Sequence, residues 1–177
     1  MPAHPPWQAL LAGRHGRQVV TALGVTGHQV IPAGAREMVV GAIRAILSEA
    51  DGPLSARTSL AAGADQLFAT ELLRTGGRLH VIVPSRNYEH TFSTDADLAL
   101  YRSLLGTADT VTRLDFEEPS EAAFLAAGKA VVDNSEMLVA VWDGKPARGL
   151  GGTADVVRYA RETGKAVIIV WPDGVGR

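Results

Sequence analysis

Glycines and small polar residues recur where apolar stretches of this sequence end, and two of these clusters have the composition of anion-binding loops. The first contains Gly24, Thr26, Gly27 and His28, and the second is Gly151-Gly152-Thr153, which precedes an amphipathic segment. Glycine lets the backbone approach an anion closely, and the first N–H groups of a helix point toward such a ligand. We therefore predict that both loops bind phosphate, although either sequence also suits a tight turn between a strand and a helix. Neither is a Walker A or G-x-G-x-x-G motif.

Three further clusters add side chains that suit the rest of a nucleotide-like ligand. Their members, each following an apolar run, are Ser59, Gly63, Asp65, Arg86, Trp142 and Asp143.

Each of these residue types offers a specific contact, and each also has an ordinary structural role. Asp65 suits a ribose hydroxyl, or else it supplies a favourable charge in a first helical turn. Arg86 suits a bidentate contact with phosphate or carboxylate, or it is simply solvated. Trp142 can stack on a base or cap the core. His28 can contact phosphate or exchange a proton near neutral pH.

The segments between these clusters predict the elements that must position them. Short apolar runs, typical of strands buried on both faces, alternate with amphipathic segments of helical period. The expected strands are residues 19–25, 57–60, 79–83, 110–114, 137–141 and 166–170, and the expected helices begin near residues 32, 64, 96, 120 and 153. This order predicts an α/β fold, a Rossmann-like, doubly wound, mostly parallel sheet of about six strands with helices on both faces. The clusters would then meet at the carboxyl edge of the sheet, where such folds bind ligands.

Length and composition restrict the classes of protein that remain. The 177 residues suit one domain, predicted as residues 18–177 after a flexible tail of residues 1–17. The absence of cysteine excludes disulfide frameworks, thiolate metal sites and cysteine nucleophiles. The five histidines show no metal-binding spacing, so neither a metal nor a cofactor is predicted. The net charge of −2 and the lack of a basic cluster predict neither a nucleic-acid nor a membrane partner, and we expect a cytoplasmic protein.

Four motifs in order resemble the SLOG superfamily, which includes the Smf/DprA DNA-processing proteins and the LONELY GUY phosphoribohydrolases. They are residues 24–28 (GVTGH), 59–65 (SLAAGAD), 138–144 (LVAVWDG) and 151–157 (GGTADVV). The resemblance spans roughly residues 18–172. It implies a Rossmann-like domain that binds a nucleotide or nucleotide-derived ligand and assembles as a homo-oligomer, a dimer or tetramer. The low charge argues against the DNA-processing branch.

The segment 137–170 is also similar to nucleoside deoxyribosyltransferases, which implies an alternative function as an N-glycosidic hydrolase or transferase. Those enzymes and the LONELY GUY family carry an acid three residues after the threonine of a Gly-Thr-x-x-Glu motif. In this chain that position is Val156, and the nearest acid is Asp155. Because such chemistry requires a carboxylate at the anomeric carbon, Asp143 and Asp155 are the predicted catalytic residues, with Asp65 as a further candidate.

Overall fold

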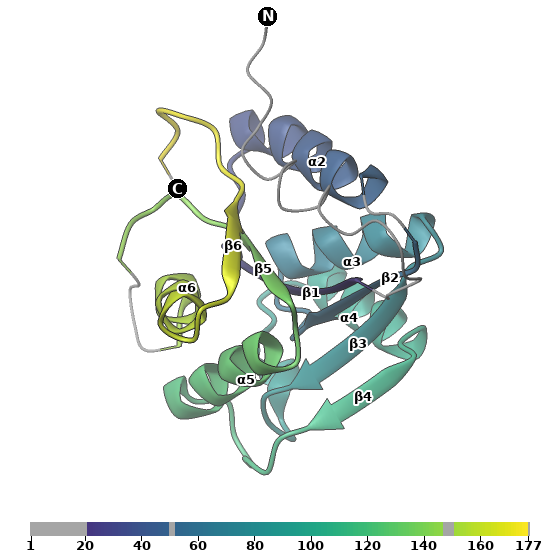
Figure 1. Ribbon diagram of the computed structural model, residues 1–177. Helices are drawn as coiled ribbons and strands as arrows, with labels where there is room; N and C mark the ends of the chain where they lie inside the picture. Colours follow the sequence, from purple (N-terminus) through teal and green to yellow (C-terminus); the bar gives the residue numbers. More distant parts are fainter. Residues whose placement is uncertain (1–20, 50–51, 147–150, 177) are drawn as a thin grey trace, which may run out of the picture.

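Within the part of the chain that the structure describes, six parallel strands form one sheet, in the order β4-β3-β2-β1-β5-β6 (Figure 1). The computed structural model describes residues 21–49, 52–146 and 151–176. The strands are β1 (Thr21–Gly27), β2 (Leu54–Thr58), β3 (Arg78–Val83), β4 (Thr110–Arg113), β5 (Met137–Val141) and β6 (Ala166–Ile169). Since β1 lies between β2 and β5, the chain extends the sheet first in one direction from β1 and then in the other.

Helices cover both faces of this sheet, which confirms the predicted doubly wound α/β fold. The helices are α2 (Ala33–Ser48), α3 (Ala64–Arg74), α4 (Asp95–Gly106), α5 (Glu121–Asp133) and α6 (Thr153–Glu162), with a short 3₁₀ helix η1 (Tyr88–Thr91). Figure 1 shows α2 and α3 on one side of the sheet, and α5 and α6 on the other. None of the helices in the described ranges is long and apolar enough to cross a membrane. The predicted tail, residues 1–17, lies outside the described residues.

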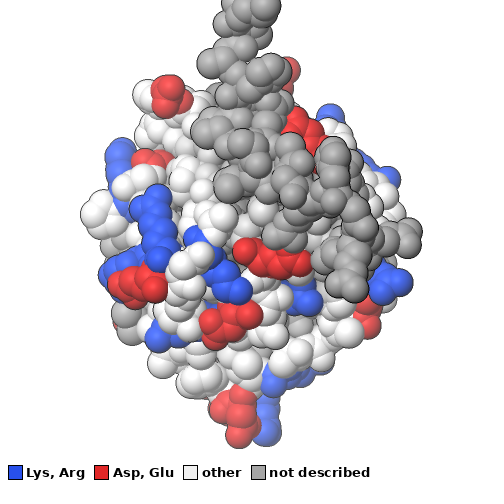
Figure 2. All heavy atoms as spheres, in the orientation of Figure 1, with Lys and Arg blue, Asp and Glu red and all other residues white. Residues whose placement is uncertain are grey.

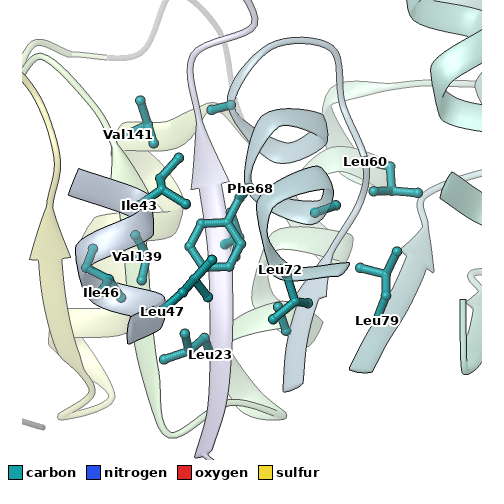
Figure 3. Packing of buried hydrophobic residues seen from close by; sticks show 14 of the residues in the cluster. Leu23, Ile43, Ile46, Leu47, Leu60, Phe68, Leu72, Leu79, Val139 and Val141 are labelled. Atoms are coloured by element: carbon teal, nitrogen blue, oxygen red, sulfur yellow. The ribbon is translucent and has the colours of Figure 1, made fainter. Parts of the chain in front are cut away.

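Two buried clusters, one on each face, hold the layers together. The larger one joins Leu23 of β1 and Val139 of β5 to Ile43 of α2 and Phe68 of α3 (Figure 3). The smaller one packs strand residues such as Leu138 against α5 and α6. Full burial of apolar side chains on both faces of β5 explains why its sequence is continuously apolar rather than alternating.

Two strand predictions need correction. The strand expected at residues 57–60 lies earlier, at Leu54–Thr58, because Leu60 has φ +56°, which ends an extended segment. The Leu60 N–H instead donates to Thr58 Oγ1 at 3.1 Å. The expectation that every strand is buried on both faces fails for β4, whose four residues are all exposed because it is an edge strand.

The N-terminus of α3 is fixed against the loop that follows β1. The Ala64 N–H donates to the His28 carbonyl oxygen at 3.0 Å. Gly63, immediately before it, has φ +81°, and a Cβ there would collide with the carbonyl oxygen of Gln29 and lie 2.6 Å from that of His28. Only glycine therefore satisfies both the backbone conformation and the close approach at position 63.

We expect the Gly63→Ala substitution to lower the free energy of unfolding by roughly 3 kcal/mol or more, because backbone strain adds to the collision with the β1 loop. Gly76→Ala is the matched control. Gly76 has a similar φ of +76° but no atom within 4 Å of a Cβ, so only the strain of about 1–2 kcal/mol applies. Urea denaturation of both variants measures the difference. Equal losses would show that the approach of α3 to the β1 loop is not tightly constrained.

Candidate functional site

A cleft of about 670 Å³ opens at the carboxyl edge of the sheet, beside the point where the strand order reverses. Its walls come from the end of β1 and the loops after β1, β2 and β3, and from α5 and the start of α6. The lining residues are Val25, Thr26, Gly27, His28, Gln29, Val30, Ser59, Ala61, Asp65, Pro84, Tyr88, Thr91, Glu121, Phe124, Gly128, Val131, Gly151, Gly152, Thr153, Ala154 and Val156. Reversal of strand order separates adjacent loops and leaves a crevice in folds of this kind.

The structure brings most of the predicted ligand-binding residues to this cleft. Those that line it are Thr26, Gly27, His28, Ser59, Asp65, Gly151, Gly152 and Thr153. They come from three separate clusters of the sequence, after β1, after β2 and before α6. The structure therefore places these three clusters around one cleft, and their contacts with a ligand stay predictions.

The start of α6 presents backbone donors to the cleft. Its N-cap, Gly152, provides no side-chain cap, whereas Thr94 and Ser120 cap α4 and α5 with their hydroxyls. The first N–H groups of a helix have no acceptor within the helix, and the helix dipole makes that end positive. Thr153 adds a hydroxyl at the same point of the lining. This end of the cleft therefore suits an anionic group.

His28 is held rigidly at the junction of β1 and β5. Its Nε2 lies 2.9 Å from Asp143 Oδ1, and both side chains are buried. The imidazole ring is also perpendicular to the indole ring of Trp171, with ring centroids 5.0 Å apart. Asp143 Oδ1 additionally accepts a hydrogen bond from the Lys145 N–H at 3.1 Å. His28 thus lines the cleft, while Asp143 lies behind it and orients the ring.

Asp65 is a buried carboxyl group in the cleft wall. Its Oδ2 accepts a hydrogen bond from Thr58 Oγ1 at 2.7 Å, and the backbone N–H groups of Ser59 and Ala61 also donate to the carboxyl. Burial raises the pKa of Asp65 from 3.8 to about 7, and these three hydrogen bonds only partly oppose that effect. Asp65 can therefore act as hydrogen-bond acceptor or donor near neutral pH.

Aromatic side chains form another part of the wall. Tyr88 and Phe124 line the cleft, with ring centroids 6.4 Å apart. Tyr88 packs in turn against Phe92 and Tyr101. Burial, and secondarily the charge of Asp65, raises the pKa of Tyr88 well above its usual value, so its hydroxyl is neutral at physiological pH. This region suits the apolar faces of a planar ring.

The cleft carries little positive charge. Its described lining residues include no Lys or Arg, but they include two acidic residues, Asp65 and Glu121. An anion bound here would depend on backbone N–H groups and on His28.

Three predicted residues of the strands and their loops lie outside the lining. Gly24 packs under α5, where a Cβ would lie 3.0 Å from Ser135 Oγ. Gly63 supports the β1 loop, as described above. Arg86 is exposed, and its guanidinium pairs with Asp115 at 3.2 Å and Glu117 at 3.5 Å.

Trp142 and Asp155 also lie outside the lining. The indole N–H of Trp142 donates to the Lys145 carbonyl oxygen at 2.8 Å. Asp155 accepts from the Gly151 N–H at 3.0 Å and from Arg158 at 2.8 Å. Asp155 therefore holds the glycine loop at the start of α6, beside the cleft.

The sequence does not predict Tyr88, Phe124 and Glu121 as site residues. Glu121 and Phe124 line the cleft because of the path of α5. This helix connects β4, at one edge of the sheet, to β5 near its middle, and it passes beside the cleft. Phe124 and Gly128 lie one helical turn apart on α5, and both line the cleft. The spacing of small and aromatic residues on that face was the available signal.

Solved structures with this fold include proteins of several kinds. DNA processing protein A (DprA) of Streptococcus pneumoniae is 17% identical with a TM-score of 0.62, over 85% of this chain and 50% of that one. DprA of Helicobacter pylori is 14% identical with a TM-score of 0.60, over 84% of this chain and 64% of that one. The molybdenum cofactor binding protein of Rippkaea orientalis is 19% identical with a TM-score of 0.54, over 86% of this chain and 77% of that one.

These similarities confirm the Rossmann-like fold that the motifs imply. This chain spans about half of the S. pneumoniae protein and under two thirds of the H. pylori protein. No protein-family model matches the sequence, and no curated protein matches it.

The comparisons correct one expectation. The sequence predicts no nucleic-acid partner because of its net charge, yet the H. pylori protein, which has the same fold, binds single-stranded DNA. Net charge is a sum over the whole chain, and it does not report where charges gather on the folded surface. The exclusion of nucleic acid is therefore withdrawn.

Asp65 gives the stability of the protein a specific pH dependence. Between pH 4 and 7 the folded state keeps a proton on Asp65 that the unfolded chain has released, so the free energy of unfolding falls as pH rises through this range. We expect Asp65→Asn to remove this slope, so that the variant gains roughly 2–3 kcal/mol relative to the unchanged protein between pH 5 and 8. Urea denaturation at several pH values measures it, with the exposed Asp95→Asn as control. Parallel pH profiles for Asp65→Asn and the unchanged protein would contradict the raised pKa.

Proposed function

We propose that the cleft binds a nucleotide or a nucleotide-derived ligand, as part of a sensor or binding protein. The observation that carries this proposal is the meeting of the β1 loop, the β2 loop and the start of α6 around one cleft at the strand-order reversal. The cleft volume of about 670 Å³ lies within the range of about 300–1,000 Å³ that is usual for small-molecule sites.

The distribution of groups along the walls supports an orientation for the ligand. Its phosphate would accept hydrogen bonds from the first turn of α6, including the Thr153 hydroxyl, with His28 nearby. Asp65 would bind a ribose hydroxyl, and the base would pack against Tyr88 and Phe124. Because the described lining contains no Lys or Arg, this arrangement favours a ligand with few negative charges.

The structural neighbours support ligand binding in general terms and do not select a ligand. One neighbour is described as a molybdenum cofactor binding protein and another as binding single-stranded DNA. The choice of a nucleotide therefore depends on the cleft and on the motifs.

A second candidate function is cleavage or transfer at an N-glycosidic bond, and the position of Asp65 favours it. Val156, at the position of the acid in the related enzymes, lines the cleft as an apolar residue packed on Gly128. Asp143 and Asp155 are engaged with His28 and with Arg158, although both stay predicted catalytic residues. Asp65 lines the cleft, and its pKa of about 7 suits proton transfer.

We expect isothermal titration calorimetry to detect a nucleoside monophosphate, cyclic nucleotide, ADP-ribose or NAD binding with one site per chain. Removal of the Thr153 hydroxyl in Thr153→Val should weaken that binding about tenfold, the effect of a hydrogen bond to a charged group. Thr163→Val, at the opposite end of α6, should leave the affinity unchanged. Absence of heat from every compound at millimolar concentration would contradict the proposed function.

If the second candidate holds, the protein releases free base from a nucleoside monophosphate: the C1′–N bond breaks, water oxygen bonds to C1′, and the base takes up a proton. Chromatography of the products measures the rate. We expect Asp65→Asn to lower it at least 100-fold, the scale of general acid–base catalysis, with Asp95→Asn as control. Binding without release of base from any common nucleotide would exclude this candidate and leave the binding function in place.

A further inference from the structure

β4 is an edge strand, and within the described part of the chain no other strand lies on its outer side. It pairs with β3 alone, and its four residues, Thr110–Arg113, are all exposed. In Figure 1 it is the outermost arrow of the sheet, beside β3. An exposed edge strand presents unpaired N–H and C=O groups, to which a further strand can add.

Alternate residues of β4 bond to β3, so the residues between them point their backbone groups toward the free edge. Leu114, directly after β4, donates its N–H to the Val83 carbonyl oxygen at 3.0 Å. Successive residues of a strand turn their backbone groups to opposite sides, so the two threonines of β4 also bond to β3. Val111 and Arg113 therefore direct their N–H and C=O groups outward.

The side chains along this edge form a self-complementary pattern centred on Val111. Val111 is an exposed apolar residue, Asp109 lies two positions before it, and Arg113 lies two positions after it. When two copies of this edge are laid antiparallel about a twofold axis at Val111, the two valines lie opposite each other. The same operation places each Asp109 opposite Arg113 of the second copy, and each threonine opposite a threonine.

Neither charge of this pattern is paired within its own chain. Figure 2 shows basic and acidic side chains interspersed on one face of the molecule, and exposed arginines such as Arg86 and Arg102 pair with carboxylates. Over the described ranges, no carboxylate lies within 4.0 Å of the Arg113 guanidinium, and no basic group lies within that distance of the Asp109 carboxyl. Four residues of extended chain span roughly 13 Å, so these two side chains do not pair along one strand.

Asp109 is already held in place for such a contact. Its Oδ2 accepts a hydrogen bond from the Leu79 N–H at 2.9 Å, and its own N–H donates to the Leu79 carbonyl oxygen at 2.8 Å. The residue is nevertheless exposed, and a carboxylate has further lone pairs that an arginine can bond. An arginine from a second copy would therefore bond to a carboxylate whose position is fixed.

The opposite edge of the sheet has no comparable pattern. β6 (Ala166–Ile169) is the other edge strand, and it contains no charged residue. Nothing in its side chains would align a second copy in one register, since register depends on specific pairs across the strands. The observations therefore favour β4 over β6 as a contact between copies.

We propose that two copies of this chain associate through β4, antiparallel, about a twofold axis at Val111. The sheet then continues from one copy into the other. Hydrogen bonds join the outward backbone groups of the two Val111 residues, and two Asp109–Arg113 ion pairs flank them.

The size and direction of this contact determine its strength and its relation to the cleft. One short strand per chain buries less than the ~1,200 Å² of a standard stable interface, so association is reversible, with a dissociation constant on the order of 10 µM. Because the two sheets run antiparallel, their carboxyl edges and clefts face opposite directions. The contact therefore does not depend on the function proposed for the cleft.

Sedimentation velocity of the full chain tests the association at roughly 1 to 500 µM, a range that spans the expected dissociation constant. Arg113→Glu places a carboxylate opposite Asp109 of the second copy at both ends of the contact. We expect it to weaken association about tenfold, because two favourable cross-strand pairs become repulsive. Arg36→Glu, the same change at an exposed residue of α2, is the matched control and should leave association unchanged.

Mixing two variants separates charge pairing from damage to the fold. Asp109→Lys alone should weaken association as Arg113→Glu does, because two basic side chains then face each other. In an equimolar mixture of these two variant chains, the heterodimer regains both ion pairs, so association should return to that of the unchanged protein. If Asp109→Lys does not fold, Asp109→Asn keeps the acceptor for the Leu79 N–H and should weaken association about threefold through loss of charge.

Hydrogen exchange at low and high protein concentration locates the contact. The Val111 N–H should exchange more slowly at high concentration, and this protection should be reduced in Arg113→Glu. The proposal is overturned if the protein stays monomeric at about 500 µM, or if Arg36→Glu weakens association as much as Arg113→Glu. It is also overturned if Ile169→Asp, at an exposed residue of β6, dissociates the dimer while Arg113→Glu does not.

Discussion

The position of β1 inside the sheet is the constraint on which the rest of the structure depends. With β2 on one side and β5 on the other, the connection after β1 turns toward α2 on one face, while the connection after β5 turns toward α6 on the opposite face. The two loops therefore diverge from adjacent strand ends and leave a space between them. The cleft is a consequence of this topology, and its side chains determine what it can hold.

Close packing, rather than charge, gives this cleft its shape. Gly63 lets the N-terminus of α3 lie on the β1 loop, and Gly151, with φ +81°, lies against the backbone of α5 at Leu125. His28 is fixed by Asp143 from behind. A wall built in this way presents main-chain donors and few cations, so its selectivity comes from hydrogen-bond geometry more than from long-range attraction.

The sequence was sufficient to predict the order of the elements because each one has a clear period and clear end signals. β5 matches its predicted range and α6 begins at its predicted residue, whereas β2 is shifted because one hydrogen bond and the positive φ of Leu60 end it early. Residues after strand ends were predictable as a group, since parallel strands bring their carboxyl ends together. The roles of Asp143 and Phe124 were not predictable in this way, because they depend on pairing with His28 and on the path of α5.

The failed exclusion of nucleic acid has the same physical origin. Arg57, Arg78 and His80 are up to 23 positions apart in a sequence without a basic segment, yet strand register makes them neighbours. A net charge of −2 describes attraction at long range, where the contributions of both signs cancel. At contact distance a ligand meets only the local groups, and two arginines without a carboxylate partner in the described part of the chain present a positive surface on an acidic protein. The partners that a protein can bind therefore depend on the charges of its folded surface, where strand register determines which residues are neighbours.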